Sequence, residues 1–225
     1  MNSRQVRAQI ENITSLLVEH SLCDEQNFPS IKNSGEFTLI TIPGDPDIAA
    51  ALKSNKNYSE IYRNLDEARS FNFRMLDGAI VQLLYQFNKN EMLVKHRLAY
   101  FPSPSLESFQ NNPEVYECDE IYADILVKNI VPFPLRFDYS SDEEAHIVVH
   151  HPKSHMTLGQ YQNCRIPVCS PISPIVFVKF LLRSFYNTAY CAYETKINVP
   201  ATFFPLSIAD SEREIPHIAL SRSLA

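Results

Sequence analysis

Glycine is scarce in this chain of 225 residues, which contains only Gly35, Gly44, Gly78 and Gly159. They make up about 2% of the residues, against a usual share of ~7%. No two of them lie close enough in the sequence to form a loop that surrounds a phosphate group. The sequence therefore excludes the glycine-rich dinucleotide motif and the P-loop.

Long apolar segments are missing as well. The longest, residues 175–182, is interrupted by Lys179 and is far shorter than the ~20 residues that cross a bilayer. The first eleven residues carry charges throughout and lack the apolar stretch of a secretory signal. We therefore predict a cytoplasmic protein with no membrane partner. The composition, with 45% hydrophobic and 20% charged residues, is typical of a globular protein.

Charge and cysteine content exclude further classes. The formal net charge of −6 makes the molecule as a whole repel polyanions, so any binding of nucleic acid requires a local cationic site. The five cysteines are an odd number at spacings that match no disulfide framework or zinc ribbon, and we expect reduced thiols that behave as small hydrophobic side chains. The sequence requires no cofactor, and participation of a divalent metal stays open.

Hydrophobic periodicity predicts a single α+β domain over residues 1–225. Apolar residues at helical spacing predict an N-terminal amphipathic helix, and alternating patterns over 37–168 predict a mostly antiparallel, strongly twisted sheet of six to seven strands. We expect this sheet to pack on a long C-terminal core helix. The expected elements are a helix over 4–22, a loop over 23–36, a strand over 37–42, helices over 48–53 and 58–68, a three-stranded meander over 71–101, strands over 133–139, 154–159 and 164–168, a core helix over 174–193 and an extended segment over 195–225. Residues 120–128 fit either a helix or a strand.

The strand over 133–139 carries the first two candidate site residues. Its apolar residues share one face, and Arg136 and Asp138 share the other, about 7 Å apart. A guanidinium beside a carboxylate can bind a ligand, or the two groups can form a solvated ion pair on the outer surface of the sheet.

Two strands predicted later in the sequence carry further candidate site residues. If 154–159 and 164–168 pair as a hairpin, His155, Thr157 and Arg165 project from one face. Together with the first pair they would bind a phosphate or carboxylate group and leave His155 for proton transfer. In the structural alternative, His155 and Thr157 only bridge strands and the arginines cap loop carbonyls. The remaining candidates for ligand binding are Arg97, on the outer face of the preceding meander, and His151.

Four of the seven histidines lie within ten residues, at His146, His150, His151 and His155. The first two have the spacing of a helical zinc motif, but Ile147 occupies the place of its glutamate. The β-branched residues between them favour a strand, which would hold the two imidazoles ~13 Å apart, too far for one ion. We therefore predict no metal ligands here.

The segment 154–159 resembles the His-hydrophobe-Thr-hydrophobe element of two-histidine phosphoesterases. That resemblance implies that His155 exchanges a proton and that Thr157 binds a phosphate oxygen. Those enzymes contain two copies of the element. Only one complete copy occurs here, because the segments that begin at His146 and His217 lack the hydroxyl.

A wider set of motifs resembles an uncharacterised bacterial family, domain of unknown function 2290. The set comprises Leu76-Asp77-Gly78, the segment 96–102, the segment 135–139, His151-Pro152-x-x-His155-x-Thr157-x-Gly159, and the segment 164–174 with a helix that ends in Phe185-Tyr186. The resemblance extends from about residue 60 to 190. It transfers no activity, and it implies a bacterial cytoplasmic protein of the kind encoded with mobile-element or phage-defence genes.

Three functions stay open at this point. The first is hydrolysis of a phosphodiester or nucleotide, as in a phosphodiesterase or nuclease. In this hypothesis His155 is the general acid or base, Asp138 orients it or holds a metal, and Arg136 and Arg165 bind the phosphate. The second is a binding module that recognises a nucleotide, a nucleic-acid end or a protein without chemistry. The third is an adaptor whose N-terminal helix binds a larger ATPase or nuclease encoded nearby. Composition does not separate them.

Overall fold

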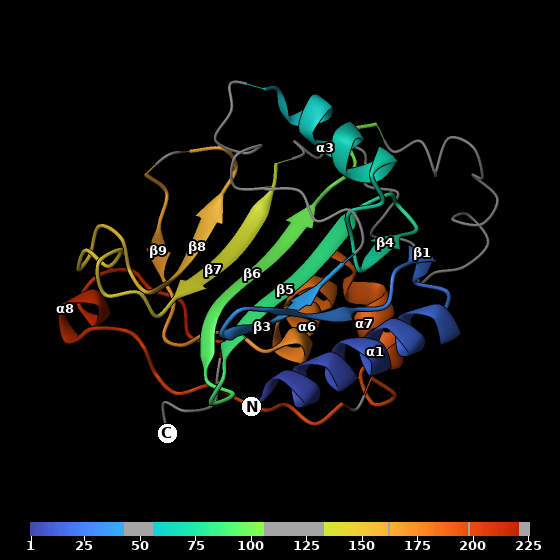
Figure 1. Cartoon of the computed structure of the whole chain (residues 1–225). Helices are drawn as coiled ribbons and strands as arrows, with labels where there is room; N and C mark the ends of the chain where they lie inside the picture. The colour runs from blue at the N-terminus through green and yellow to red at the C-terminus, as the bar shows by residue number, and fades with distance from the viewer. Residues whose placement is uncertain (43–55, 106–132, 162, 198, 221–225) are drawn as a thin grey trace.

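A nine-stranded antiparallel sheet forms the centre of the molecule (Figure 1). The computed structural model describes residues 1–42, 56–105, 133–161, 163–197 and 199–220. The strands are β1 (Cys23–Gln26), β2 (Ser30–Ser34), β3 (Phe37–Thr41), β4 (Phe73–Met75), β5 (Ile80–Asn88), β6 (Leu93–Phe101), β7 (Leu135–Ser140), β8 (Ser154–Leu158) and β9 (Ile166–Pro167). Seven of them follow the order β1-β4-β5-β6-β7-β8-β9, while β3 pairs with β5 and β2 with β3. The predicted α+β fold with an antiparallel sheet is confirmed.

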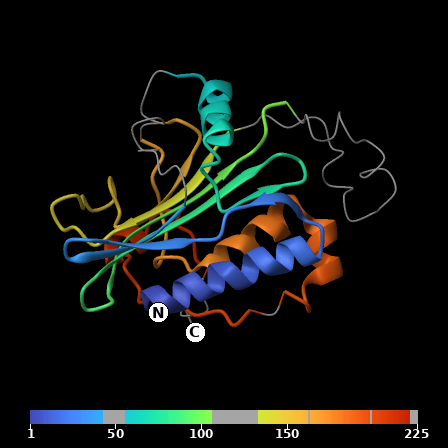
Figure 2. The ribbon, with the colours of Figure 1, turned by 45° about the vertical axis from the view of Figure 1, so that its right-hand side comes forward.

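Helices lie on both sides of this sheet (Figure 2). The helices are α1 (Ser3–Glu19), α3 (Tyr58–Glu67), α6 (Pro174–Phe185), α7 (Asn187–Tyr193) and α8 (Asp210–Arg213). The first face of the sheet packs on α1 and α6: Phe137 of β7 meets Phe177 and Phe180 of α6 edge to face, with ring centroids 5.8 and 5.6 Å apart. The helix α3 covers the other face only at one end of β5 and β6, where Ile61 packs with Phe101 in a smaller apolar cluster.

Ion pairs anchor α3 and the edge strand β1 to the sheet. Arg74 of β4 lies 2.9 Å from Asp24, 2.6 Å from Glu25 and 2.9 Å from Asp66 of α3. The prediction of a loop over 23–36 is therefore wrong, because this segment forms β1 and β2. Backbone pairing with β4 and β3, together with these ion pairs, holds strands whose polar residues have little strand propensity of their own.

The predicted core helix over 174–193 is interrupted. Tyr186 leaves the helical conformation with φ −135° and ψ 50°, so α6 and α7 are separate helices. The buried Tyr186 hydroxyl donates to the carboxylate of Asp77 at 2.9 Å and lies 3.1 Å from the Tyr100 hydroxyl. This polar contact accounts for the break, which an apolar pattern that continues past Tyr186 does not reveal.

The C-terminal segment is more firmly attached than a loose extended end would be. Ile218 forms a parallel bridge with Val168, and the Ile218 N–H donates to the Pro167 carbonyl at 2.9 Å. The segment also contains α8. The helix predicted over 48–53 and the segment 120–128 lie outside the described residues.

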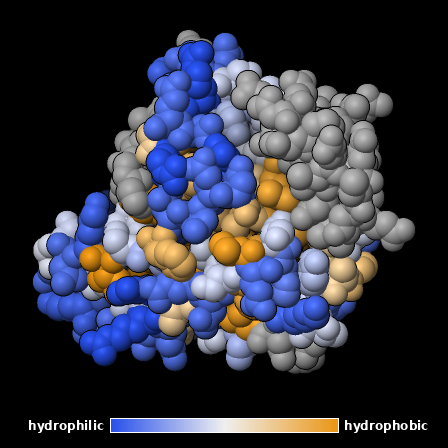
Figure 3. All heavy atoms as spheres, turned by 90° about the vertical axis from the view of Figure 1, so that its right-hand side faces the viewer, coloured by the Kyte–Doolittle hydropathy of each residue, from blue (hydrophilic) through white to orange (hydrophobic). Residues whose placement is uncertain are grey.

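Three further features concern the surface, the thiols and the length of the helices. The face in Figure 3 is mostly hydrophilic in its upper part and exposes apolar side chains in separate patches lower down. Cys23, Cys164, Cys169 and Cys191 are free thiols. Among the helices of the described ranges, none has the length and apolar character needed to span a bilayer.

Candidate functional site

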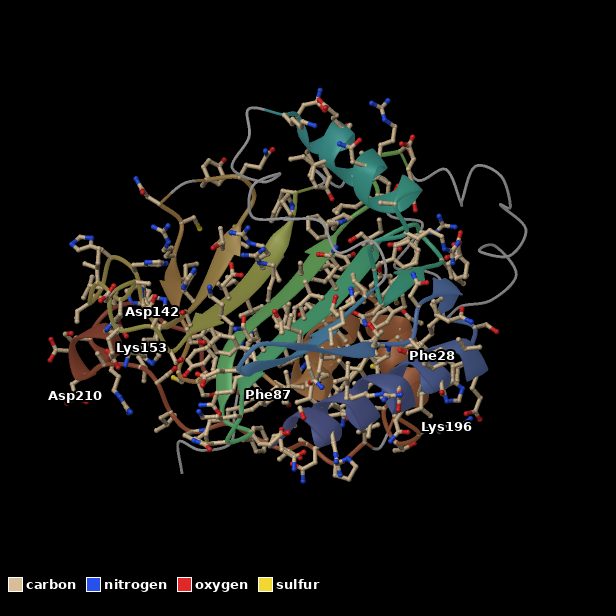
Figure 4. All side chains as sticks on the ribbon, viewed as in Figure 1. Phe28, Phe87, Asp142, Lys153, Lys196 and Asp210 are labelled. Atoms are coloured by element: carbon tan, nitrogen blue, oxygen red, sulfur yellow. The ribbon has the colours of Figure 1, made fainter. Side chains whose placement is uncertain are left out.

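A pocket of about 550 Å³ lies on the face of the sheet that α1 and α6 leave uncovered. Residues from β3, β5, β6, β7 and β8, from the turn that connects β7 to β8, and Arg165 just before β9 form its wall. Asp142 and Lys153 mark the two ends of that turn at the left edge of the sheet in Figure 4. Six of the seven residues predicted for the site line this pocket: Arg97, Arg136, Asp138, His151, His155 and Arg165.

Strand register explains why these residues meet. Arg97 pairs with Asp138, and Asp138 pairs with His155, so the three side chains form a row across β6, β7 and β8. Directly paired residues place their Cβ atoms about 5 Å apart on the same face of a sheet. Arg136 lies in the next row, opposite Thr157. Thr157 is buried and shares the face, but it does not line the pocket.

Asp138 is held between two arginines. Its Oδ1 accepts from Nε of Arg97 at 3.0 Å, and its Oδ2 lies 3.1 Å from Nε of Arg136. Burial alone would raise the pKa of Asp138, but the charges of Arg136 and Arg97 outweigh it, so the pKa lies below its usual value. The carboxylate is therefore ionised, and the three groups together carry one positive charge.

His155 is buried and bonded to the backbone, with 7% of its surface exposed. Its Nδ1 lies 2.9 Å from the Pro152 carbonyl oxygen. Because a carbonyl only accepts hydrogen bonds, Nδ1 carries the proton and Nε2 is the basic nitrogen. Burial lowers the pKa of His155 despite the neighbouring Asp138, so the imidazole is neutral at pH 7. The expected orientation of His155 by Asp138 is replaced by this bond to Pro152.

Arg165 differs from the other two predicted arginines, because it has no ion-pair partner among the residues that the structure describes. No carboxylate of the described residues lies within ion-pair distance of its guanidinium. Its charge nevertheless reaches the site: after burial, Arg97 and Arg165 are the groups that lower the pKa of Arg136. The His151 ring lies beside that of His155, with ring centroids 5.2 Å apart. Arg165 is therefore available to an anion in the pocket.

Sequence reasoning missed two further cations in the pocket wall, Lys95 and Lys153. Lys95 lies two residues before Arg97 on β6, so strand alternation alone would have placed it on the same face. Lys153 forms an ion pair of 2.5 Å with the exposed Glu143. Among the described residues, the wall contains five Lys or Arg and two Asp, so this part of the wall is cationic within a chain of net charge −6.

The histidines at 146 and 150 do not lie on a strand as predicted. Residues 147–151 form a turn closed by two hydrogen bonds between Ile147 and His151, of 3.1 and 2.6 Å. His146 lies 3.3 Å from Oε1 of the buried Glu212 in α8. In the portion of the chain that the structure describes, no group of three or more His, Cys, Asp or Glu side chains could hold a metal ion.

Glu212 connects this turn to the C-terminal segment. Its fully buried carboxylate also accepts from the backbone N–H groups of Val149 at 3.2 Å and Ala209 at 2.9 Å. Val149 has φ +70°, which is unfavourable for a β-branched residue. Glu212 therefore helps to hold the turn that places His151 beside His155.

We predict that Glu212→Ala lowers the free energy of unfolding by about 2 kcal/mol, because it leaves buried donors without an acceptor. The Val149 amide should exchange with deuterium at least 10-fold faster. Glu212→Gln, which keeps one acceptor oxygen, should show a smaller effect, and Glu214→Ala on the exposed side of the same segment should show none. Unchanged exchange at Val149 in Glu212→Ala would contradict this role.

His96 supplies a second testable feature next to the site. It is buried, and its Nε2 accepts from the Ile172 N–H at 3.0 Å. Burial lowers its pKa from 6.5 to about 4. The unfolded chain therefore takes up a proton at a higher pH than the folded protein. This contribution to stability is complete above pH 6.5 and is lost as the pH falls toward 4.

We expect urea unfolding between pH 7 and 4.5 to show this loss, with a slope of up to about 1.4 kcal/mol per pH unit from His96. His96→Gln keeps an acceptor for Ile172 and should flatten the curve. The same substitution at the exposed His150 should leave the slope unchanged. A slope that His96→Gln does not alter would show that another group causes the loss.

Comparison with protein families finds one match. The model of the uncharacterized conserved protein family DUF2290 matches residues 22–220. The chain belongs to this family. The DUF2290 match covers all nine strands and every residue of the pocket wall, whereas α1 precedes it. The searches of curated proteins and of solved structures find no match.

Proposed function

We propose that the pocket binds a small ligand that carries a phosphate group, as a nucleotide or phosphodiester does. The observation that carries this proposal is the row of Arg97, Asp138 and His155 with Arg136 and Arg165 beside it. Both arginines approach the Asp138 carboxylate through Nε, at 3.0 Å for Arg97 and 3.1 Å for Arg136. Their terminal nitrogens have no hydrogen-bond partner among the described residues and are free to donate to phosphate oxygens.

Binding is tested by calorimetric titration with inorganic phosphate, pyrophosphate and the four ribonucleoside 5′-monophosphates. We expect at least one of them to bind with a dissociation constant below 1 mM, and we expect the affinity to fall as the salt concentration rises. Arg63→Gln, an exposed arginine of α3 far from the pocket wall, serves as the control. Failure of all six probes to bind would refute the proposal.

Hydrolysis of the bound phosphodiester is the second candidate function. The observation that favours it is the neutral His155 with its proton fixed on Nδ1, because Nε2 can then act as a general base at pH 7. The burial of His155 and its backbone partner favour binding without chemistry. The two candidates therefore differ in what His155 does once the ligand is bound.

A single assay separates them. Hydrolysis of bis-p-nitrophenyl phosphate is measured with Mg²⁺ and with EDTA, for the wild type, His155→Asn and His150→Asn. Asparagine at 155 can still donate to the Pro152 carbonyl but cannot act as a base near pH 7. Activity that only His155→Asn abolishes supports catalysis. Equal activity in all three proteins, or none in the wild type, leaves the pocket as a binding site.

A further inference from the structure

The pocket has two chemically different halves. Within the described parts of the chain, the five Lys or Arg residues of its wall come from β6 and the segments after it, namely Lys95, Arg97, Arg136, Lys153 and Arg165. The residues that β3 and β5 contribute are uncharged: Leu39, Ile40, Thr41, Leu84, Tyr85 and Gln86. The ligand therefore meets charge at one end and an apolar surface with a few neutral polar groups at the other.

Register shows which side chains of the uncharged half share a face with the arginines. Leu84 pairs with Arg97, and so continues the row of Asp138 and His155 onto β5. Gln86 pairs with Lys95 on one side and with Leu39 of β3 on the other. Leu39, Leu84 and Gln86 are only partly buried, so their side chains contribute accessible surface.

Gln86 is a polar group available for recognition. Among the described residues its side-chain amide has no hydrogen-bond partner, although it presents two donors and an acceptor. An amide flanked by leucines fits a flat group with hydrogen-bonding edges and apolar faces. Nucleobases have this character, and proteins read them through their edges while apolar side chains cover their faces.

The spacing between the two halves fits one nucleotide. Gln86 pairs with Lys95, which pairs with Ser140 of β7, and Arg136 lies four residues from Ser140. Two strand intervals across the sheet and about 13 Å along β7 therefore separate the backbones of Gln86 and Arg136 by roughly 17 Å, a gap that two long side chains shorten. A free phosphate cannot bridge that interval, whereas a nucleoside monophosphate can. The negative net charge of the chain disfavours a polyanion, which points to a free mononucleotide rather than to the end of a nucleic-acid strand.

We infer that the pocket binds a free nucleoside monophosphate, with the phosphate on Arg97, Arg136 and Arg165 and the base on Leu84 and Gln86. This inference rests on the proposed function, because it names the ligand class of the same pocket. It assigns recognition of the base to β5, a strand that carries none of the residues predicted for the site.

The test compares ribose 5-phosphate, the four nucleoside monophosphates and a 5′-phosphorylated tetranucleotide in the same calorimetric assay. We expect at least one monophosphate to bind 10-fold more tightly than ribose 5-phosphate. Gln86→Ala and Leu84→Ala should remove that gain and change the affinity for ribose 5-phosphate less than twofold. Gln26→Ala, an exposed glutamine of β1, is the matched control, and circular dichroism verifies folding.

The outcomes separate this inference from the proposal on which it rests. If no phosphate compound binds, the proposed function fails. If ribose 5-phosphate binds as tightly as every monophosphate, or if Gln86→Ala leaves their ratio unchanged, only the base site fails. Tighter binding of the tetranucleotide than of any monophosphate would overturn the assignment to a free mononucleotide. If Leu84→Ala does not fold, the affinities measured for Gln86→Ala, at a partly exposed position, still test the base site.

Discussion

Asp138→Asn should lower the free energy of unfolding by about 3 kcal/mol, because Asp138 is the one carboxylate among the described residues that forms ion pairs with the partly buried Arg97 and Arg136. In the folded protein 28% of the Arg97 side chain and 17% of the Arg136 side chain are exposed, so water screens their mutual repulsion poorly. For a chain of this length, the loss corresponds to a fall in melting temperature of roughly 6–12 °C. Thermal and urea unfolding measure it directly.

Two control variants make this prediction specific. Asp142→Asn changes an exposed carboxylate of the same pocket and should shift stability by less than about 0.5 kcal/mol. Adding Arg136→Gln to Asp138→Asn should restore part of the lost stability, because it removes one of the two uncompensated charges. If the double variant is less stable than the sum of the two single changes, repulsion between the arginines is not the cause.

The pH dependence of the same ion pairs has a defined sign. Because the pKa of Asp138 is lower in the folded protein than its ordinary value of 3.8, the ion pairs contribute their full stability above that pH. The contribution is lost as the pH falls through the lowered value. Unfolding of Asp138→Asn should therefore depend less on pH below 4 than unfolding of the wild type.

The ion pairs of Asp138 change the interpretation of Arg136 and Asp138 in the sequence. Strand alternation predicted that Arg136 and Asp138 share a face, but it offered no way to decide between an ion pair and a ligand site. In the structure both arginines form ion pairs with Asp138 through Nε, and the proposed anion binding would use their terminal nitrogens. Arg136 accordingly contributes to stability as well as to the proposed binding, so its substitution is a poor test of function alone.

Much of the site could be predicted because strand alternation is a local rule. Together with the assumption that segments 154–159 and 164–168 pair as a hairpin, it placed His155 and Arg165 on the same face, and β8 does pair with β9. Alternation did not reveal Glu212, whose contact with the turn at 146–149 depends on how the C-terminal segment returns to β9. It also gave no sign that Pro152 rather than Asp138 fixes the proton of His155, since that bond depends on the conformation of the turn.

The fold was predicted best where packing and local pattern agree. The meander and α1 have clear apolar faces, and both formed as expected. The strands β1 and β2 were missed because their stability comes from partners distant in the sequence, such as the contacts of Arg74 with Asp24 and Glu25. The interruption of the predicted core helix at Tyr186 also depends on a partner distant in the sequence, because the Tyr186 hydroxyl donates to Asp77, more than a hundred residues away.

Arg165→Gln should weaken binding of a nucleoside monophosphate about 10- to 100-fold, the loss expected when one hydrogen-bonded charge on a phosphate is removed. The melting temperature should change by less than about 2 °C, because Arg165 has no ion-pair partner among the described residues and its removal relieves repulsion with Arg136. Calorimetric titration and thermal unfolding of the same preparation test both parts.

The combination of weaker binding and unchanged stability distinguishes Arg165 from every other cation of the pocket wall except Lys95. Arg97 and Arg136 form ion pairs with Asp138, and Lys153 forms an ion pair with Glu143. Arg63→Gln removes the same charge from the exposed face of α3 and should leave the affinity within twofold of the wild type. If Arg63→Gln and Arg165→Gln weaken binding equally, the effect comes from net charge, and the pocket is not where the phosphate binds.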